Sequence, residues 1–401
     1  MKLRAILRSE PYWIIIGLFW LIMGGIYIAH LATGWTPNRE ALNLAFLGDF
    51  AVYWYGIVIM AGVTLGAYVA SRLAHERAVA LLEQTVPAKI RRRSVDELAL
   101  PAEIKAILTK NRITTLGQLL LVWGFNPEAI GLNRIGVRAV REKLAAAADL
   151  DPLWLSDDPP WRQWNPDYVW GGIGVCLVLG VIGARLYHVL TPSPSMAAVG
   201  INSPLDYFRN PWQLINLRNG GLGIYGGIVG GVLGLLWYTS RNRLATLAWA
   251  DLAAIGLSLG QMMGRWGNFF NQELYGQPTT LPWAVRIDPT NRLADYANIE
   301  RFHPAFLYES LWSLFTFIVL HTLAKRYQNK LQPGELTALY LILYGVGRTL
   351  LELVRLDSRT VSLGGVNLNL PIATLVSLLI AVVMAVWMGL RRRNARVKTN
   401  S

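Results

Sequence analysis

The residues best suited to chemistry gather in one short stretch, Gly264–Gly276, which reads GRWGNFFNQELYG. The stretch lies where a long apolar run ends, and among its aromatic residues it carries Arg265, Asn268, Asn271 and Glu273. Polar groups at the edge of a bilayer cost free energy unless they are paired or used. We therefore interpret this cluster as a candidate binding or catalytic site.

Other charged residues lie inside apolar segments and point to the same kind of site. Arg348, Glu352 and Arg355 are spaced i, i+4 and i+7, so they share one face of a helix. Three more polar residues lie within a turn or two of the corresponding end of their own predicted spans: Arg185, Tyr225 and Glu309. We expect these groups to converge at headgroup depth in the outer leaflet. Several inward-facing arginines there would bind an anionic phosphate, because the guanidinium fork matches phosphate oxygens.

Each of these features has a plainer explanation when it is taken alone. The pair Arg348 and Glu352 could be a buried structural ion pair, and Arg265 could be an interfacial arginine. The glycine run GGLGIYGGIVGG at Gly220–Gly231 is explained best, by itself, as close helix packing. The clustering of all of them toward one leaflet favours a site.

The elements that must position these residues are membrane helices. Of the 401 residues, 53% are apolar and only 16% are charged, whereas about a quarter are charged in a soluble protein. Apolar stretches of about 20 residues can span the hydrocarbon core. We predict an all-α polytopic membrane protein with eight spans: Tyr12–Ala32, Phe50–Ser71, Tyr168–Leu190, Gly221–Ser240, Ala245–Met263, Pro304–Ala324, Glu335–Leu356 and Asn369–Leu390.

The net charge of +13 is distributed unevenly about these spans. One side collects Lys2, Arg4, Arg8, Arg241, Arg243, Lys325, Arg326, Lys330, Arg391, Arg392, Arg393, Arg396 and Lys398. The opposite, longer loops carry only Arg39, Arg209, Arg218, Arg286, Arg292, Arg301 and Arg359. Because cytoplasmic loops are rich in Lys and Arg, we expect both termini to be cytoplasmic and the site to face the outer leaflet.

The same pattern divides the chain into parts. Residues 1–47 form an additional N-terminal anchor and external loop, and residues 48–80 and 168–392 form a membrane core with an external head at 267–303. Residues 81–167 form a cytoplasmic helical insert, in which glycines at 117, 131 and 136 indicate turns, and residues 393–401 form a basic tail. The first span has no cleavage-site pattern, which favours a retained anchor over a signal peptide.

The insert resembles the C-terminal domain of the bacterial RNA polymerase α subunit, a compact module with a helix-hairpin-helix-like element. Leu132–Arg138 (LNRIGVR) matches the hairpin, and Ile113–Gly117 (ITTLG) matches the preceding turn. The side chains of Arg134 and Arg138 would suit DNA. A membrane-tethered insert has little access to the chromosome, however, so a protein partner is favoured over DNA.

Several other classes of site are excluded by their missing motifs. The five histidines, at positions 30, 75, 188, 303 and 321, show no metal-ligand spacing, and the chain has no CxxC or HExxH motif. It also has no P-loop or dinucleotide fingerprint. The single cysteine, Cys176, lies within a span and is expected to pack as a small apolar residue. The sequence thus predicts no metal and no cofactor.

The motifs together resemble the prolipoprotein diacylglyceryl transferase family. GRWGNFFNQELYG matches the family signature, glycine-arginine-x-glycine-asparagine-phenylalanine-x-asparagine-x-glutamate ending in glycine. The other landmarks occur in order: WYG at Trp54–Gly56, GARLYHVL at Gly183–Leu190, GGLGIYGG at Gly220–Gly227, HPAFLYE at His303–Glu309 and YGVGRTLLELVR at Tyr344–Arg355. The resemblance covers residues 48–78 and 168–392, which correspond to a seven-helix core.

The resemblance implies an enzyme of the bacterial plasma membrane. Such an enzyme transfers the diacylglyceryl group of phosphatidylglycerol to the lipobox cysteine of a preprolipoprotein and releases glycerol-1-phosphate. It implies catalytic roles for Arg265, Arg348, Tyr225 and Glu352. It implies contacts with the lipid substrate for Tyr55, Arg185, Gly226, Gly227, Asn268, Asn271, Glu273, Gly276, His303, Glu309 and Arg355.

One position departs from the family pattern. Where Tyr225 stands, the family often has a histidine that is proposed to take the thiol proton, and a tyrosine with a pKa of about 10 is a poor acceptor for it. Either Tyr225 is an orienting hydroxyl and the cationic site lowers the thiol pKa, or His303 or a carboxylate substitutes. The first explanation is favoured.

A non-enzymatic lipid-binding or transport protein on the same fold is the alternative. A transporter would show internal repeats and polar groups near the bilayer midplane. This sequence shows no repeat, and its polar groups lie toward one leaflet.

Overall fold

The computed structural model describes residues 10–44, 50–192, 196–197, 200–209, 211–215, 221–356, 360–363 and 366–400. The basic residues Lys2, Arg4, Arg8, Arg218 and Arg359 of the predicted charge asymmetry lie outside these ranges. The chain forms two compact units. Unit 1 comprises Met1–Val69 and Ala250–Ser401, and unit 2 comprises Ala70–Trp249.

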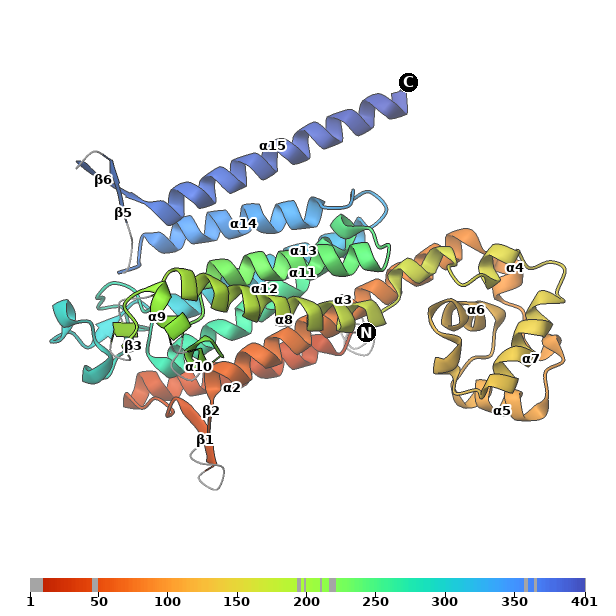
Figure 1. The fold of residues 1–401 in the computed structure, drawn as a ribbon, viewed down its shortest axis with the longest axis horizontal. Helices are drawn as coiled ribbons and strands as arrows, with labels where there is room; N and C mark the ends of the chain where they lie inside the picture. The colour runs from red at the N-terminus through yellow and green to blue at the C-terminus, as the bar shows by residue number, and fades with distance from the viewer. Residues whose placement is uncertain are drawn as a thin grey trace. The chain divides into compact units, whose positions relative to one another are not determined.

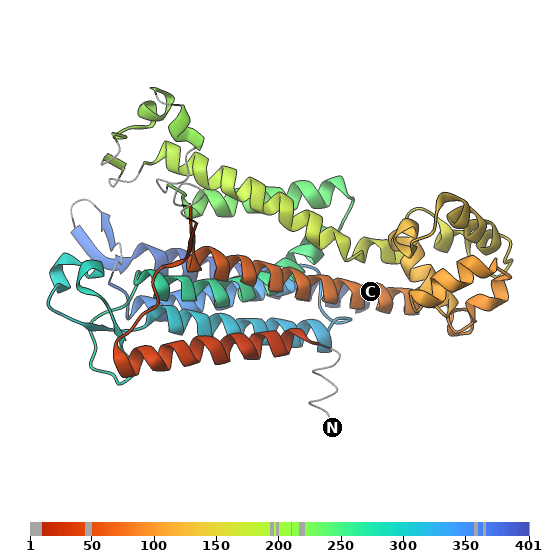
Figure 2. The same cartoon turned by 90° about the horizontal axis from the view of Figure 1, so that it is seen from below.

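Unit 1 is built from long helices that run side by side (Figures 1 and 2). They are α2 (Tyr12–Thr33), the first part of α3 (Trp54–Thr85), most of α12 (Thr246–Asn271), α13 (Ala305–Arg326), α14 (Glu335–Glu352) and α15 (Ile372–Asn400). Three antiparallel hairpins join helix ends: β1 (Glu40–Leu44) with β2 (Phe50–Tyr53), β3 (Val285–Arg286) with β4 (Arg301–Phe302), and β5 (Thr360–Leu363) with β6 (Val366–Pro371). Short 3-10 turns, η7 (Pro289–Asn291) and η8 (Ala294–Tyr296), lie between β3 and β4.

Unit 2 contains a pair of long helices, α8 (Asp167–Leu190) and α11 (Ile224–Arg241), and two short ones, α9 (Pro204–Arg209) and α10 (Trp212–Ile215). It also contains the insert (Figure 1), which is made of α4 (Ala88–Arg91), α5 (Ala102–Lys110), α6 (Leu116–Phe125) and α7 (Arg134–Ala145). The insert has four 3-10 turns: η2 (Val95–Leu98), η3 (Pro127–Ile130), η4 (Pro152–Leu155) and η5 (Pro160–Trp164).

The predicted class, an all-α polytopic membrane protein, is confirmed. Each predicted span corresponds to one long helix, and five helices among the described residues are long and apolar enough to cross a membrane: α2, α3, α8, α13 and α15. The other three, α11, α12 and α14, are less apolar. Glycine and aromatic residues lower the hydropathy of α11, while α12 and α14 carry charged and amide side chains of the candidate site.

Several predicted boundaries are wrong. The second and eighth spans were expected to begin at Phe50 and Asn369, but these residues lie in strands β2 and β6, and the helices begin at Trp54 and Ile372. Apolar residues continue from strand into helix there, so hydropathy shows no break. The polar head was expected to begin at Gly267, but α12 continues to Asn271. The polar residues of the signature are therefore presented by a helix.

Glycines bring the backbones of α3 and α12 into contact within unit 1. A Cβ added to Gly66 would lie 2.5 Å from the carbonyl oxygen of Gly256, and one added to Gly62 would lie 3.0 Å from Cα of Gly260. Such small-residue pairs let membrane helices approach closely. In unit 2 the glycine run of α11 does the same, since a Cβ on Gly226 would lie 2.1 Å from the carbonyl oxygen of Gly183 in α8. Close helix packing is the role that the sequence favoured for this glycine run when the run was considered alone.

The start of α14 is fixed to α12 by one carboxylate. Asp251 Oδ2 accepts a 2.8 Å hydrogen bond from the backbone N–H of Gly334, and Oδ1 accepts one of 2.8 Å from that of Thr337. These N–H groups belong to the first turn of a helix, where they have no partner within the helix. The two helices that carry most of the site are thus tied together at the end away from it.

The insert has its own apolar core, which includes Leu116, Leu120, Val140 and Trp161. Thr115 caps α6 in a capping box with Gln118, and Asn133 caps α7 by accepting a 2.8 Å bond from Gly136 N–H. Gly131, with φ of 80°, ends a 3-10 turn as predicted. Gly117 and Gly136 were expected in turns, but they lie inside α6 and α7, because the caps start both helices before them.

Helix α2 is anchored to α13 by a polar cluster at its start. Glu10 accepts hydrogen bonds from Tyr12 (2.6 Å) and Trp13 (2.9 Å) and forms an ion pair with Lys325. Partial burial raises the pKa of the Glu10 carboxyl, but the Lys325, Tyr12 and Trp13 donors outweigh burial and hold the pKa below its usual 4.5. The first span is therefore docked on the bundle.

Replacing Glu10 by glutamine is expected to reduce the free energy of unfolding by about 1–2 kcal/mol at pH 7, because charged hydrogen bonds are lost. A carboxyl with a lowered folded pKa stabilises the protein above its unfolded pKa of about 4.5. That stabilisation is lost as the pH falls through the lower folded pKa. Thermal unfolding of both proteins across this range would test it, and a stability difference that persists in full at acid pH would contradict the assignment.

Candidate active site

Helices α12, α13 and α14 of unit 1 enclose a cavity of about 120 Å³. Its charged lining residues are Arg265, Glu309, Arg348 and Arg355. The remainder of the lining is made of Gln261, Trp312, Ser313, Thr316, Tyr340, Tyr344, Gly347 and Leu351. The cavity therefore combines guanidinium groups with hydroxyl, amide and aromatic side chains.

Two carboxylates hold the three arginines in place. Glu309, from the start of α13, pairs through Oε2 with Nε of Arg265 and through Oε1 with Nη1 of Arg355 at 3.5 Å. Glu352 Oε2 lies 2.9 Å from Nη2 of Arg348, one helical turn earlier on α14. The structure thus brings together five of the charged residues that the sequence predicted to converge, and the sixth, Arg185, belongs to unit 2.

Three arginines and two glutamates make up the described charged cluster. The side chains of Arg348 and Glu352 are 20% and 4% exposed. Nη1 of Arg348 is buried, and among the described residues it has no hydrogen-bond partner. Oε1 and Oε2 of Glu352 are likewise buried without a hydrogen bond to the described residues. Buried polar atoms without a partner are costly, so the site offers a donor for an anion and acceptors for hydroxyl groups.

The amides of the signature converge on its carboxylate. Asn268 and Asn271 each donate through Nδ2 to Oε1 of Glu273, at 3.0 and 3.2 Å. Asn268 is buried, whereas Glu273 is exposed. The backbone after α12 turns sharply, because Gln272 and Leu274 both have φ values near +50° (52° and 53°). This is a conformation that costs free energy for residues other than glycine.

The last residue of the signature, Gly276, touches the chain that follows α14. Gly276 pairs with Arg355 in an antiparallel bridge, and its N–H donates to the carbonyl oxygen of His303 at 2.9 Å. A Cβ here would lie 2.5 Å from the carbonyl oxygen of Val354 and 2.8 Å from Cβ of His303. Glycine is required by this close approach, which fixes the backbone beside Arg355.

Two other predicted residues border the signature without lining the cavity. The ring of Tyr55, at the start of α3, lies on Gly267, where an added Cβ would be 2.0 Å from Cδ2 of the ring. Nδ1 of His303 lies 3.1 Å from the hydroxyl of Tyr308. His303 therefore has a side-chain partner of its own and supports Gly276 through its backbone.

Four predicted site residues belong to unit 2. Arg185 donates to the backbone carbonyls of Leu214 (3.0 Å), Gly221 (2.7 Å) and Gln213, so its guanidinium is engaged by backbone oxygens of unit 2. Gly226 packs on α8, whereas a Cβ added to Gly227 would make only an ordinary contact with Ala184. Tyr225 is 65% exposed, its ring lies 5.8 Å from that of Tyr187, and its hydroxyl has no hydrogen bond to the described residues.

Comparison with known proteins identifies the family of the chain. A sequence model described as prolipoprotein diacylglyceryl transferase matches residues 153–390. A protein of Chloroflexus aggregans named phosphatidylglycerol–prolipoprotein diacylglyceryl transferase is 38% identical over 247 residues, 58% of this chain and 77% of that protein. One of the same name from Gloeobacter violaceus is 42% identical over 239 residues, 59% of this chain and 82% of that protein.

The chain belongs to the prolipoprotein diacylglyceryl transferase family. It is therefore a multi-pass membrane transferase. The matched region contains α8 and α11 to α14 with the whole cavity, while α2 and most of the insert precede it.

Sequence reasoning missed part of the transferase cavity. Gln261 and Tyr344 line it one turn before Arg265 and Arg348, and Tyr340 lies one further turn back on α14. Positions i−4 from a candidate arginine share its helix face, so this spacing was a usable signal. Trp312 carried no such signal, because its ring is placed by a 2.9 Å bond to the carbonyl oxygen of Leu343 on another helix.

Proposed function

We propose that this transferase moves the diacylglyceryl group of phosphatidylglycerol to the thiol of a lipobox cysteine in a preprolipoprotein. The observation that carries the proposal is the gathering of Arg265, Arg348 and Arg355 around one cavity, where a buried guanidinium donor of Arg348 has no partner among the described residues. A phosphodiester headgroup carries one negative charge and would satisfy that donor. The names of the relatives supply the substrates, phosphatidylglycerol and prolipoprotein.

The reaction forms a thioether and needs a stabilised leaving group. The cysteine sulfur attacks the glycerol carbon that bears the phosphate, the C–O bond breaks, and the electron pair leaves with glycerol-1-phosphate. The thiol proton passes to the leaving phosphate or to solvent. Because negative charge grows on the phosphate, fixed cations lower the barrier. Arg265 and Arg348 would supply that stabilisation, and Arg355 would reinforce it.

The carboxylates and amides would hold these groups in position. Glu309 fixes Arg265 and Arg355, and Glu352 fixes Arg348, so the guanidinium groups need little reorganisation when charge develops. Asn268 and Asn271, gathered on Glu273, would orient the headgroup together with Gly276. Tyr55 would line the path of the lipid. Neither metal nor cofactor takes part in this scheme.

The thiol is proposed to lose its proton without a tyrosine base. The Tyr225 hydroxyl is exposed and has no partner among the described residues, which is unlike a tuned catalytic base. Tyr225→Phe is expected to retain transfer within about threefold of wild type. Steady-state rates at pH 7 and 8 would measure this. A loss of a hundredfold or more in Tyr225→Phe would restore the tyrosine to a catalytic role.

The proposed orientation places both termini in the cytoplasm and the cavity toward the outer leaflet. Arg241 and Arg326 end α11 and α13, Lys330 lies in the turn after α13, and Arg391 lies in the C-terminal half of α15. The positive-inside rule assigns such basic residues to the cytoplasmic side. Glu309 near the start of α13 and Arg348 near the end of α14 lie at the opposite ends of those helices. Cysteines placed in the loop at 328–334 and in the head would test this orientation when they are labelled from outside intact cells. Only the cysteine in the head should react, and labelling of the loop instead would contradict the orientation.

The insert is proposed to bind a protein rather than DNA. Its hairpin residue Ile135 is 78% exposed, and Arg138 is paired with Glu142 at 2.9 Å, so the hairpin offers apolar surface and partly neutralised charge. DNA affinity arises mainly from free cations and falls steeply with salt. We expect the full-length protein in nanodiscs to show no salt-sensitive shift of a DNA duplex, and such a shift would contradict this proposal.

The transferase proposal is tested directly with labelled diacylglyceryl phosphatidylglycerol and a lipobox peptide. Purified wild-type protein should move the label to the peptide cysteine and release glycerol-1-phosphate. A matched peptide with serine in place of the cysteine should remain unlabelled. Folded protein that binds the lipid but transfers no label would contradict the proposal and favour a lipid-binding role.

A further inference from the structure

Helix α2, which precedes the matched family region, packs against the signature helix. The ring of Trp20 lies 5.9 Å from that of Trp266, and the ring of Tyr27 lies 6.3 Å from Trp266 and 5.7 Å from Phe269. Trp266 and Phe269 directly follow Arg265 and Asn268 in sequence. Successive residues of a helix lie 100° apart, so α2 covers the face of α12 that adjoins the face carrying the site.

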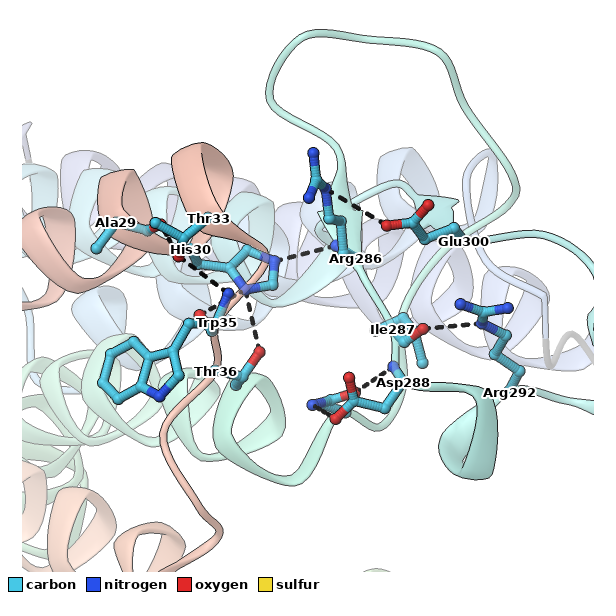
Figure 3. Close-up of polar contacts among 11 residues, drawn as sticks. Ala29, His30, Thr33, Trp35, Thr36, Arg286, Ile287, Asp288, Arg292 and Glu300 are labelled. Atoms are coloured by element: carbon cyan, nitrogen blue, oxygen red, sulfur yellow. Dashed lines mark hydrogen bonds and ion pairs between the residues drawn. The ribbon is translucent and has the colours of Figure 1, made fainter.

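The end of α2 bonds to the head through the buried histidine His30 (Figure 3) and through the Tyr27 hydroxyl, which donates to the carbonyl oxygen of Trp283 at 2.8 Å. His30 is 0% exposed. Its Nε2 lies 3.0 Å from the backbone N of Arg286, and its Nδ1 lies 3.1 Å from the carbonyl oxygen of Trp35 and 3.0 Å from Oγ1 of Thr36. A backbone N–H can only donate and a carbonyl can only accept. The ring is therefore neutral, with its proton on Nδ1 and an acceptor at Nε2.

The segment that His30 holds is itself bonded to the signature loop. Two residues beyond Arg286, Asp288 exchanges two hydrogen bonds with Gln272, each of 2.6 Å. Gln272 has a positive φ of 52° and stands between Asn271 and Glu273. A backbone in this conformation persists only when its surroundings enforce it. Hydrogen bonds and the short backbone segments between them thus connect α2 to Glu273, which gathers the signature amides.

We propose that His30 is a positioning residue for the signature loop, and that α2 is a functional part of this transferase. The histidine acceptor fixes Arg286, the segment from Arg286 to Asp288 fixes Gln272, and Gln272 sets the direction of Glu273 and its asparagines. This inference rests on the proposed function. Helix α2 would then be required for catalysis although it lies before the matched family region.

The test compares His30→Ala, His30→Gln and Thr33→Ala in the full-length protein, with labelled phosphatidylglycerol and a lipobox peptide. His30→Ala should lower kcat by about 10–100-fold with a smaller change in KM, because misplacing site groups by about 1 Å has effects of this size. His30→Gln should recover most of the activity, since its amide oxygen can accept from Arg286 N–H. Thr33→Ala should resemble wild type, because this exposed hydroxyl bonds within its own helix end.

A double-mutant cycle separates positioning from general destabilisation. His30→Ala and Asp288→Ala break the same path, so the double variant should lose little more kcat than the stronger single variant. Multiplicative losses, or a His30→Ala protein as active as Thr33→Ala, would overturn the inference while leaving the proposed function intact. Failure of wild type and Thr33→Ala to transfer label would overturn both.

Discussion

Arg348→Ala should reduce diacylglyceryl transfer by about 10²–10³-fold or more, because it removes a fixed donor from the charge that develops on the leaving phosphate. It also leaves Glu352 buried without its cation. The loss should appear in kcat, measured as label transferred to the lipobox peptide at saturating lipid.

Two companion variants separate the missing guanidinium from the unpaired carboxylate. Arg348→Ala with Glu352→Gln removes the unpaired carboxylate but does not restore the donor, so it should remain inactive if the donor is what matters. Arg138→Ala removes an exposed arginine of the insert that pairs with Glu142 and does not line the cavity. It should transfer normally. Full activity in the double variant would assign the effect to Glu352 and would contradict the role of Arg348.

Gly276→Ala should lower transfer by about a hundredfold or more, for a steric reason. Its Cβ would lie 2.5 Å from the backbone oxygen of Val354, which cannot move without shifting Arg355. Overpacking of this kind also costs about 1–3 kcal/mol of stability. Activity and thermal unfolding of the same preparation would measure both effects.

Gly260→Ala is the matched control, since a Cβ there meets no atom within 4 Å. Alanine inside a helix should increase stability by about 0.5–1 kcal/mol, and activity should be unchanged. If the two alanine variants transferred label equally well, the bridge between Gly276 and Arg355 would not be needed for activity.

Hydropathy was sufficient to predict the long helices, because each needs about 20 apolar residues whatever packs beside it. It could not predict where helices start after a strand, as at Phe50–Tyr53, since one apolar run serves both elements. Hydropathy also could not predict that α12 continues through Arg265 and Asn268. Arg265 is paired there by Glu309, a carboxylate that comes from another helix, α13.

The candidate site was predicted best where residues share a helix and least well where a contact joins distant segments. The i, i+4 pair of Arg348 and Glu352 could be read directly from spacing. The attachment of Glu309 to both Arg265 and Arg355 follows only from how three helices pack. The docking of α2 on the signature helix had no sequence signal, because aromatic residues are equally common on lipid-facing surfaces of a span.

The glycines that join α3 to α12 also restrict how a lipid can move. Gly66 and Gly256 bring the two backbones so close that an added methyl group would lie 2.5 Å from a carbonyl oxygen. At that level of the bundle these two helices leave no room between their backbones for an acyl chain. Under the proposed function, a substrate lipid would therefore have to reach the cavity between other helices.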